Sequence, residues 1–164
     1  KIALKLQNLL EQNGSKVILT RSDNNAIYDL DSKTLKQKKI SDIKNRVKIG
    51  NENSADIFVS IHLNKIPQSE YHGWQCFYNT KNEKSIELAK KIQENLNEAI
   101  QKENTRVAMK LNTVYIMKNI EIPISIVECG FLSNPEEEKK LLEDSYQDRL
   151  AWGIYNGILD YFYN

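Results

Sequence analysis

The sequence lacks several features that would point to whole classes of function. No apolar run approaches the roughly 18–20 residues that a membrane-spanning helix needs, and the first residues have no signal-peptide core. The 23 Lys and Arg residues nearly balance the 22 Asp and Glu residues, which gives a net charge of +1. Because this balance produces no strong positive field, the sequence predicts neither a transmembrane segment nor a nucleic-acid partner.

Cysteine and histidine are also scarce. The chain has two of each, at Cys76, Cys129, His62 and His72, too few for a disulfide framework or an all-histidine metal site. Both cysteines lie in apolar, strand-like runs, which predicts buried, inert thiols, with a single bridge between them as the alternative. His72 precedes an expected strand, and we expect it on a surface loop. Any metal site would therefore need ligands other than histidine.

What is present is the composition of one globular domain, residues 1–164, with 40% hydrophobic and 27% charged residues. Apolar residues at helical spacing and their flanking residues predict the helices. These are expected at 1–13 with Gly14 as the C-cap, at 41–51 with Ser41 as the N-cap, at 83–101, from Asn134-Pro135 onward, and at 146–162. Apolar, β-branched runs predict strands at 17–20, 55–62, 74–78, 113–117 and 124–129, with an exposed polar loop at 21–39.

Strands that alternate with helices predict the α/β class, as a single domain with a mainly parallel or mixed central sheet and helices on both faces. In such sheets, ligands bind beyond the carboxyl ends of the strands. His62 ends one buried run, and Glu128 stands at the end of another. These two residues are therefore the first candidates for a functional site.

Each candidate has a functional and a structural interpretation. His62 could bind a metal or act in catalysis, or it could simply bond a backbone carbonyl at the strand end. Glu128 follows Ile124-Ser125-Ile126-Val127, so its carboxylate would lie beside a low-dielectric core and have a raised pKa unless it is paired. A carboxylate tuned in this way suits a general base; an ion pair with a Lys or Arg at the rim is the alternative.

Two segments in this order resemble a known family. Ser60-Ile61-His62-Leu63-Asn64 together with Val127-Glu128-Cys129-Gly130-Phe131-Leu132-Ser133-Asn134 is similar to the zinc-dependent N-acetylmuramoyl-L-alanine amidases of the AmiC/CwlD type, and most to the compact spore-cortex group. Thr20-Arg21, Arg46 and Asn51 also fall in the order that this family shows. The resemblance covers most of the chain.

The resemblance implies a zinc ion held by His, Glu and His, and a second Glu that activates water to cleave the amide between N-acetylmuramic acid and L-alanine. His62 matches the last zinc ligand and Glu128 the catalytic carboxylate. Zinc lowers the pKa of bound water, and a non-ligating carboxylate can take and return the proton. The resemblance also implies substrate-binding roles for Asn64 and Arg46, with a structural role for Asn64 as the alternative.

The sequence departs from the family at its start. The family's first ligand lies in a Gly-His-Gly-Gly loop after an opening strand, and its Glu ligand lies before the first helix; both would precede Lys1. We therefore expect a longer natural protein, and a chain that is inactive and nearly metal-free by itself, because one imidazole does not hold zinc.

The function expected from the resemblance is hydrolysis of peptidoglycan in the cell envelope or the forespore intermembrane space. Glycan strands with stem peptides would be the substrate, and an accessory protein could supply targeting or timing. A catalytically silent peptidoglycan-binding or partner-docking domain with the same fold is the alternative. The sequence upstream of Lys1 would separate the two.

Overall fold

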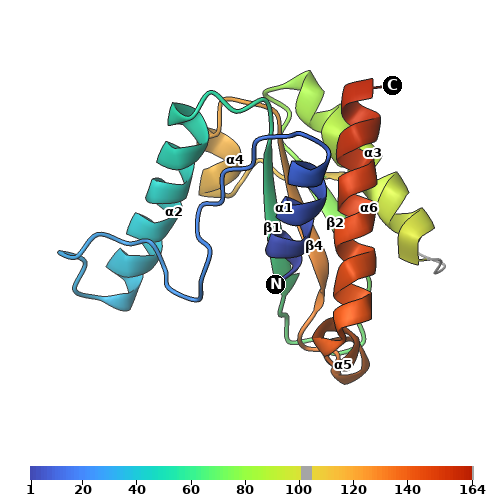
Figure 1. Cartoon of the computed structure of the whole chain (residues 1–164). Helices are drawn as coiled ribbons and strands as arrows, with labels where there is room; N and C mark the ends of the chain where they lie inside the picture. Colours follow the sequence, from blue (N-terminus) through green and yellow to red (C-terminus); the bar gives the residue numbers. More distant parts are fainter. Residues whose placement is uncertain (101–104, 164) are drawn as a thin grey trace.

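A computed structural model describes residues 1–100 and 105–163 of the chain (Figure 1). Helices and strands are interspersed along the chain, as the sequence predicts for the α/β class. In chain order they are α1 (Ile2–Gln12), α2 (Leu35–Glu52), β1 (Phe58–Asn64), β2 (Gln75–Tyr78), α3 (Glu83–Ile100), β3 (Met109–Lys110), α4 (Tyr115–Asn119), β4 (Ile124–Phe131), α5 (Pro135–Leu142) and α6 (Asp144–Tyr163).

The central sheet has four strands in the order β1-β4-β2-β3. β1 runs parallel to β4, β2 runs antiparallel to β4, and β3 runs parallel to β2. This mixed sheet confirms the predicted architecture. β4 is the strand with the deepest burial, because it has a neighbour on each side and seven of its eight residues are buried.

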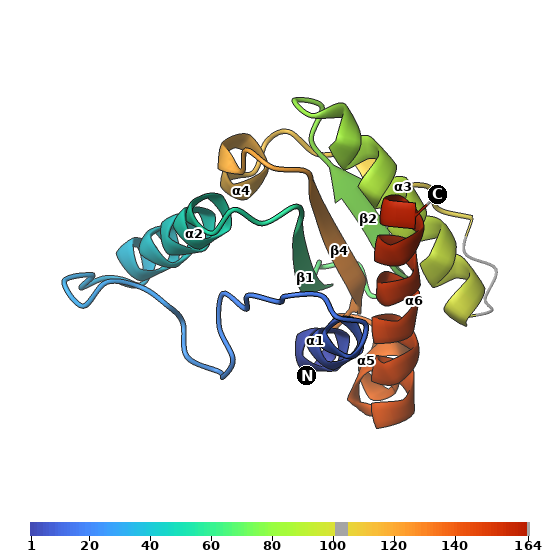
Figure 2. The same ribbon diagram turned by 45° about the horizontal axis from the view of Figure 1, so that its top comes forward.

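Helices cover both faces of the sheet, as expected. On one face α1, α3 and α6 enclose the larger apolar core together with Cys76, Val127 and Cys129. On the other face α2 and α4 contribute Val47, Met117 and Ile120 to a smaller cluster that covers Ile124 and Ile126. Figure 2 shows this asymmetry: α3 and α6 lie together against the sheet, whereas α2 extends away from it.

Two glycines allow α6 to approach α3 very closely. A Cβ added at Gly153 would lie 2.9 Å from the Cα of Leu96, and one added at Gly157 would lie 2.8 Å from the backbone nitrogen of Ile92. Real Cβ atoms essentially never come so close to backbone. The packing of α6 on α3 in the larger core therefore requires residues without a side chain at positions 153 and 157.

The ends of the first two helices test the predicted caps. Gly14, with φ +82°, follows α1, and its N–H donates to the carbonyl of Glu11 at 3.0 Å, which confirms its role at the helix end. The prediction that Ser41 caps the second helix is wrong. α2 begins before Ser41, at a capping box formed by Thr34 and Gln37. Ser41 is buried in the interior of the helix and donates to the Asp29 carboxylate at 2.8 Å.

Two predicted strands are also absent from the described residues. Residues 17–20 form no strand, and Ile18 is 38% exposed; a strand needs a hydrogen-bonded neighbour as well as apolar residues. Residues 113–117 instead run into the short helix α4, because Met117 and Ile120, three positions apart, both enter the smaller core. The predicted end of the third helix at Gln101 lies outside the described residues.

Candidate active site

His62 and Glu128 lie side by side at the end of the parallel pair of strands. They are Cα partners in the register of β1 with β4, and Gln75 of β2 is the antiparallel partner of Glu128 on its other side. Because side chains alternate along a strand, Glu128 shares a face with Ile124 and Ile126, which lie under α2 and α4. The site therefore begins where the smaller apolar cluster ends.

A β-bulge directly follows Glu128. The register advances from His62↔Glu128 to Asn64↔Phe131, so β4 takes one residue more than β1 over this interval. Gly130 lies within the bulge, with φ +155°. Bulges are frequent beside active sites, because they redirect side chains and end strand pairing. This one interrupts the regular pairing of β4 with β1 immediately beyond Glu128, before Phe131 pairs with Asn64.

The Glu128 carboxylate is desolvated on one side. Burial raises the pKa of this carboxyl above its ordinary value, and within the described part of the chain its buried Oε2 has no hydrogen-bond partner. No ion pair to Glu128 is found there either, which disfavours the interpretation as half of a rim salt bridge. A carboxylate with raised basicity and an uncommitted oxygen can accept a proton from a reacting group.

The surroundings of the His62 imidazole favour its neutral form. Desolvation is the largest cause that lowers the pKa of His62 below its ordinary value, and the positive charges of Arg46 and Arg21 lower this pKa further. Its Nε2 shares a hydrogen bond of 2.9 Å with the hydroxyl of Ser60 on the same strand, and the side chain remains exposed. Neutral imidazole is the form that binds metal ions.

The two residues expected to contact substrate are placed differently. Asn64 is partly buried at the end of β1, where its carbonyl accepts the N–H of Leu132 at 2.7 Å. Arg46 forms a bidentate pair with Asp42, at 2.7 and 3.1 Å, and also donates to the hydroxyl of Thr20 at 2.8 Å. Arg46 therefore links the chain near residue 20 to α2. Its positive charge also contributes to the lowered pKa of His62.

Glu137 is a buried residue of this region that the sequence did not single out. It is 6% exposed, and its carboxylate accepts the N–H groups of Gly73 and Phe131 at 2.6 and 2.7 Å. The available signal was the N-cap at Asn134, which confirms the predicted helix start and places Glu137 in the first turn of α5. Since Glu136, Glu137 and Glu138 are consecutive, the sequence could not tell which one is buried.

The described residues do not by themselves complete a metal site. No group of three His, Cys, Asp or Glu side chains within them is placed to hold an ion, so His62 is a candidate ligand without two companions there. Cys76 and Cys129 are buried free thiols, as expected. His72 is exposed in the loop before β2, which also agrees with the prediction.

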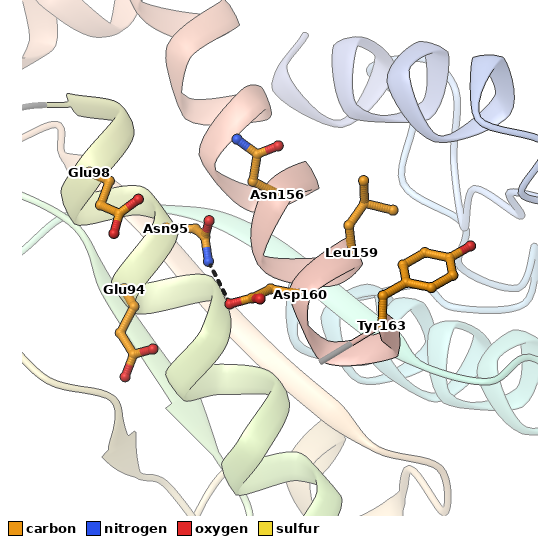
Figure 3. Close-up of a pocket in the computed structure, with 7 residues that line it drawn as sticks. All are labelled: Glu94, Asn95, Glu98, Asn156, Leu159, Asp160 and Tyr163. Carbon is orange, nitrogen blue, oxygen red and sulfur yellow. Dashed lines mark hydrogen bonds between the residues drawn. The ribbon is translucent and has the colours of Figure 1, made fainter.

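Two hollows of the surface lie away from His62 and Glu128. A groove of about 390 Å³ between α3 and α6 is lined by the residues drawn in Figure 3, where Asn95 donates to Asp160 at 3.3 Å. A larger hollow of about 1000 Å³ lies beside the start of β4, near Ile122 and Pro123. Neither is lined by the two candidate residues.

The fold is thus an α/β domain that places the imidazole of His62 and the half-buried carboxylate of Glu128 side by side on adjacent strands. The model of the N-acetylmuramoyl-L-alanine amidase family matches residues 1–160. The chain belongs to this family. The family, enzyme class and fold expected from the sequence are thereby confirmed.

Individual relatives agree. The chain is 36% identical over 162 residues to a germination-specific N-acetylmuramoyl-L-alanine amidase of Bacillus subtilis, a match that spans 99% of this chain and 68% of that protein. Its structure is similar to the CwlD amidase of Clostridioides difficile in complex with the GerS lipoprotein (TM-score 0.94, 44% identity, 98% and 82% of the two chains). A Clostridium difficile N-acetylmuramoyl-L-alanine amidase has a TM-score of 0.82 at 31% identity, over 98% and 80% of the chains.

Proposed function

We propose that this protein hydrolyses the amide bond between the lactyl group of N-acetylmuramic acid and the L-alanine of a peptidoglycan stem peptide. Water adds to the amide carbonyl carbon, the carbon–nitrogen bond breaks, and the products are a lactyl carboxylate and a free alanine amine. The observation that carries this proposal is Glu128, a half-buried carboxylate at a strand end with raised pKa and a buried oxygen without a partner in the described chain.

Glu128 is proposed as the general base and then the general acid. It takes a proton from the attacking water and returns it to the nitrogen of the departing alanine. A raised pKa suits both steps, because the carboxylate is basic enough to accept the proton and the acid is still strong enough to give it back.

His62 is proposed as one ligand of a zinc ion. The support is its neutral imidazole beside Glu128 and the resemblance to zinc-dependent amidases. Zinc sites of this kind need three protein ligands, so the others would come from outside the described residues. The 164 residues alone are accordingly proposed to be inactive and nearly metal-free.

Asn64 and Arg46 are proposed to contribute to substrate binding. Asn64 lies two residues beyond His62 at the same strand end. Arg46 would act through its charge, since its Nε, Nη1 and Nη2 groups already donate to Asp42 and Thr20.

The place of action and the partners are also proposals. Relatives named as a germination-specific amidase and as a cell wall amidase support hydrolysis of peptidoglycan outside the cytoplasm, in the envelope or between the forespore membranes. The complex of the similar CwlD amidase with a lipoprotein supports an accessory protein for this one. Of the helices that the structure describes, none has the length and apolar character needed to cross a membrane.

The test compares three versions of the complete gene product on purified peptidoglycan. New alanine amino termini are measured by mass spectrometry of the released peptides, and zinc is measured on the same samples. Glu128→Gln should keep its zinc and lose most turnover, whereas His62→Ala should lose both. Wild type that binds peptidoglycan but releases no peptide would instead favour the silent binding domain, and equal zinc in both variants would reject the proposed division of roles.

A further inference from the structure

Glu137 connects two segments that flank the candidate base. One oxygen of its carboxylate accepts the N–H of Gly73, two residues before Gln75, and the other accepts the N–H of Phe131, three residues after Glu128. Glu128 and Gln75 are partners in the register of β4 with β2. A single buried side chain thus joins the loop that enters β2 to the end of β4.

The surrounding sequence is shaped to admit this carboxylate. A Cβ at Gly130 would lie 3.1 Å from Cδ and 3.3 Å from Cγ of Glu137, so a larger residue in the bulge would press on it. Asn134 caps α5 by accepting the N–H groups of Glu136 and Glu137, and its own amide donates to the carbonyl of Ser69 at 3.0 Å. The first turn of α5 therefore holds the loop 65–74 at two points.

The chemistry of the contact requires a carboxylate. Gly73 and Phe131 are both buried, and a buried N–H group needs an acceptor. An ionised carboxylate is acceptor-only and can serve both donors at once. Glutamine has the same shape but offers one acceptor and one donor, so it would leave one of the two N–H groups facing an N–H.

We propose that Glu137 is a positioning residue for the reaction: by holding the end of β4 and the loop before β2 together, it keeps Glu128 at a fixed place between His62 and Gln75. This inference rests on the proposed amidase function. Displacements of about 1 Å at a reacting group reduce rates by about 100-fold. The hydrogen bond to Phe131 lies three residues from Glu128 along β4, and the one to Gly73 lies two residues before Gln75, the partner of Glu128 on β2.

The experiment measures kcat and KM for amide release by the complete gene product and its Glu137→Gln variant, with Glu138→Gln as the matched control. Glu138 is exposed on the same helical turn. We expect Glu137→Gln to lower kcat by about 10- to 100-fold, with KM and zinc content nearly unchanged, and the control to retain wild-type values. Hydrogen exchange should be faster at the amides of Phe131 and Gly73 in Glu137→Gln alone.

The outcomes separate this inference from the function on which it rests. An inactive wild type would overturn both, whereas an active wild type with unchanged kcat in folded Glu137→Gln would overturn only the positioning role. If Glu137→Gln does not fold, Glu137→Asp decides, because it keeps the charge but is too short to reach both donors. Folded Glu137→Asp with reduced kcat supports the proposal; wild-type kcat, or unfolding of both variants, assigns Glu137 to stability alone.

Discussion

Replacing Gly157 with alanine should destabilise the domain through the contact between α3 and α6. The added methyl would lie 2.8 Å from both the carbonyl oxygen of Lys91 and the backbone nitrogen of Ile92, at least 0.6 Å inside the 3.4 Å where ordinary contact begins. These atoms belong to the backbone of α3 and cannot rotate away. The two helices would have to separate, and Leu88, Ile92 and Leu96, all fully buried, would lose contacts.

The size of the effect follows from two opposing terms. In an exposed helix, Gly→Ala stabilises by about 1 kcal/mol, whereas overpacking a core costs about 1–3 kcal/mol or more. Because the clash is with backbone, the upper end applies, and Gly157→Ala should lose about 2 kcal/mol net. That is a fall in Tm of about 4–8 °C for a chain of this size. Gly153→Ala, whose methyl would lie 2.9 Å from Leu96, should lose less.

Thermal and urea unfolding of the complete gene product measure this directly. Asn156→Ala is the control, since it lies on the same helix and gains only helix propensity; its Tm should not fall. If Gly157→Ala were as stable as the control, the helices would not be in the close contact described, and the packing argument would be refuted. Amidase activity below the transition should survive, because the contact lies on the face of the sheet opposite to the site.

Two further predictions concern charge and thiols. Desolvation alone would raise the pKa of the Asp42 carboxyl. Hydrogen bonds from Arg46 and from a backbone N–H outweigh this effect and make the pKa of Asp42 lower than its ordinary value. Its contribution to stability is therefore present at neutral pH and lost below about pH 4, so the Tm difference between wild type and Asp42→Asn should vanish in acid. Burial raises the pKa of both Cys76 and Cys129, so a thiol reagent should label neither in the folded protein and both after unfolding; rapid labelling of the native protein would contradict their burial.

Much of the site could be predicted because it depends on where buried strands end. His62 and Glu128 follow apolar runs, and the sequence shows such runs directly. That the two residues become neighbours depends on β1 pairing with β4, which lies more than sixty residues later in the chain. The sequence therefore identified the two candidate residues, whereas their position side by side follows from the order of the strands in the sheet.

What could not be predicted depends on long-range partners. Glu137 accepts a hydrogen bond from Gly73, which lies 64 residues earlier in the chain. The sequence alone also does not distinguish Glu137 from its neighbours Glu136 and Glu138. Residues 17–20 have the composition of a strand but no neighbouring strand in the described chain. Residues 113–117 are β-branched and apolar, yet the position of Met117 against the smaller core selects helix. In each case tertiary contacts overrode local preference.

The unequal size of the two cores has a consequence for motion. α2 has 18 residues, but Val47 is its one buried apolar side chain, so this layer has a smaller apolar core than the layer of α3 and α6. Native-state opening begins where apolar burial is smallest, and we expect α2 to open at a lower free energy than α3 or α6. Since the site starts at the border of that layer, such an opening would widen access to Glu128 while the larger core stays folded.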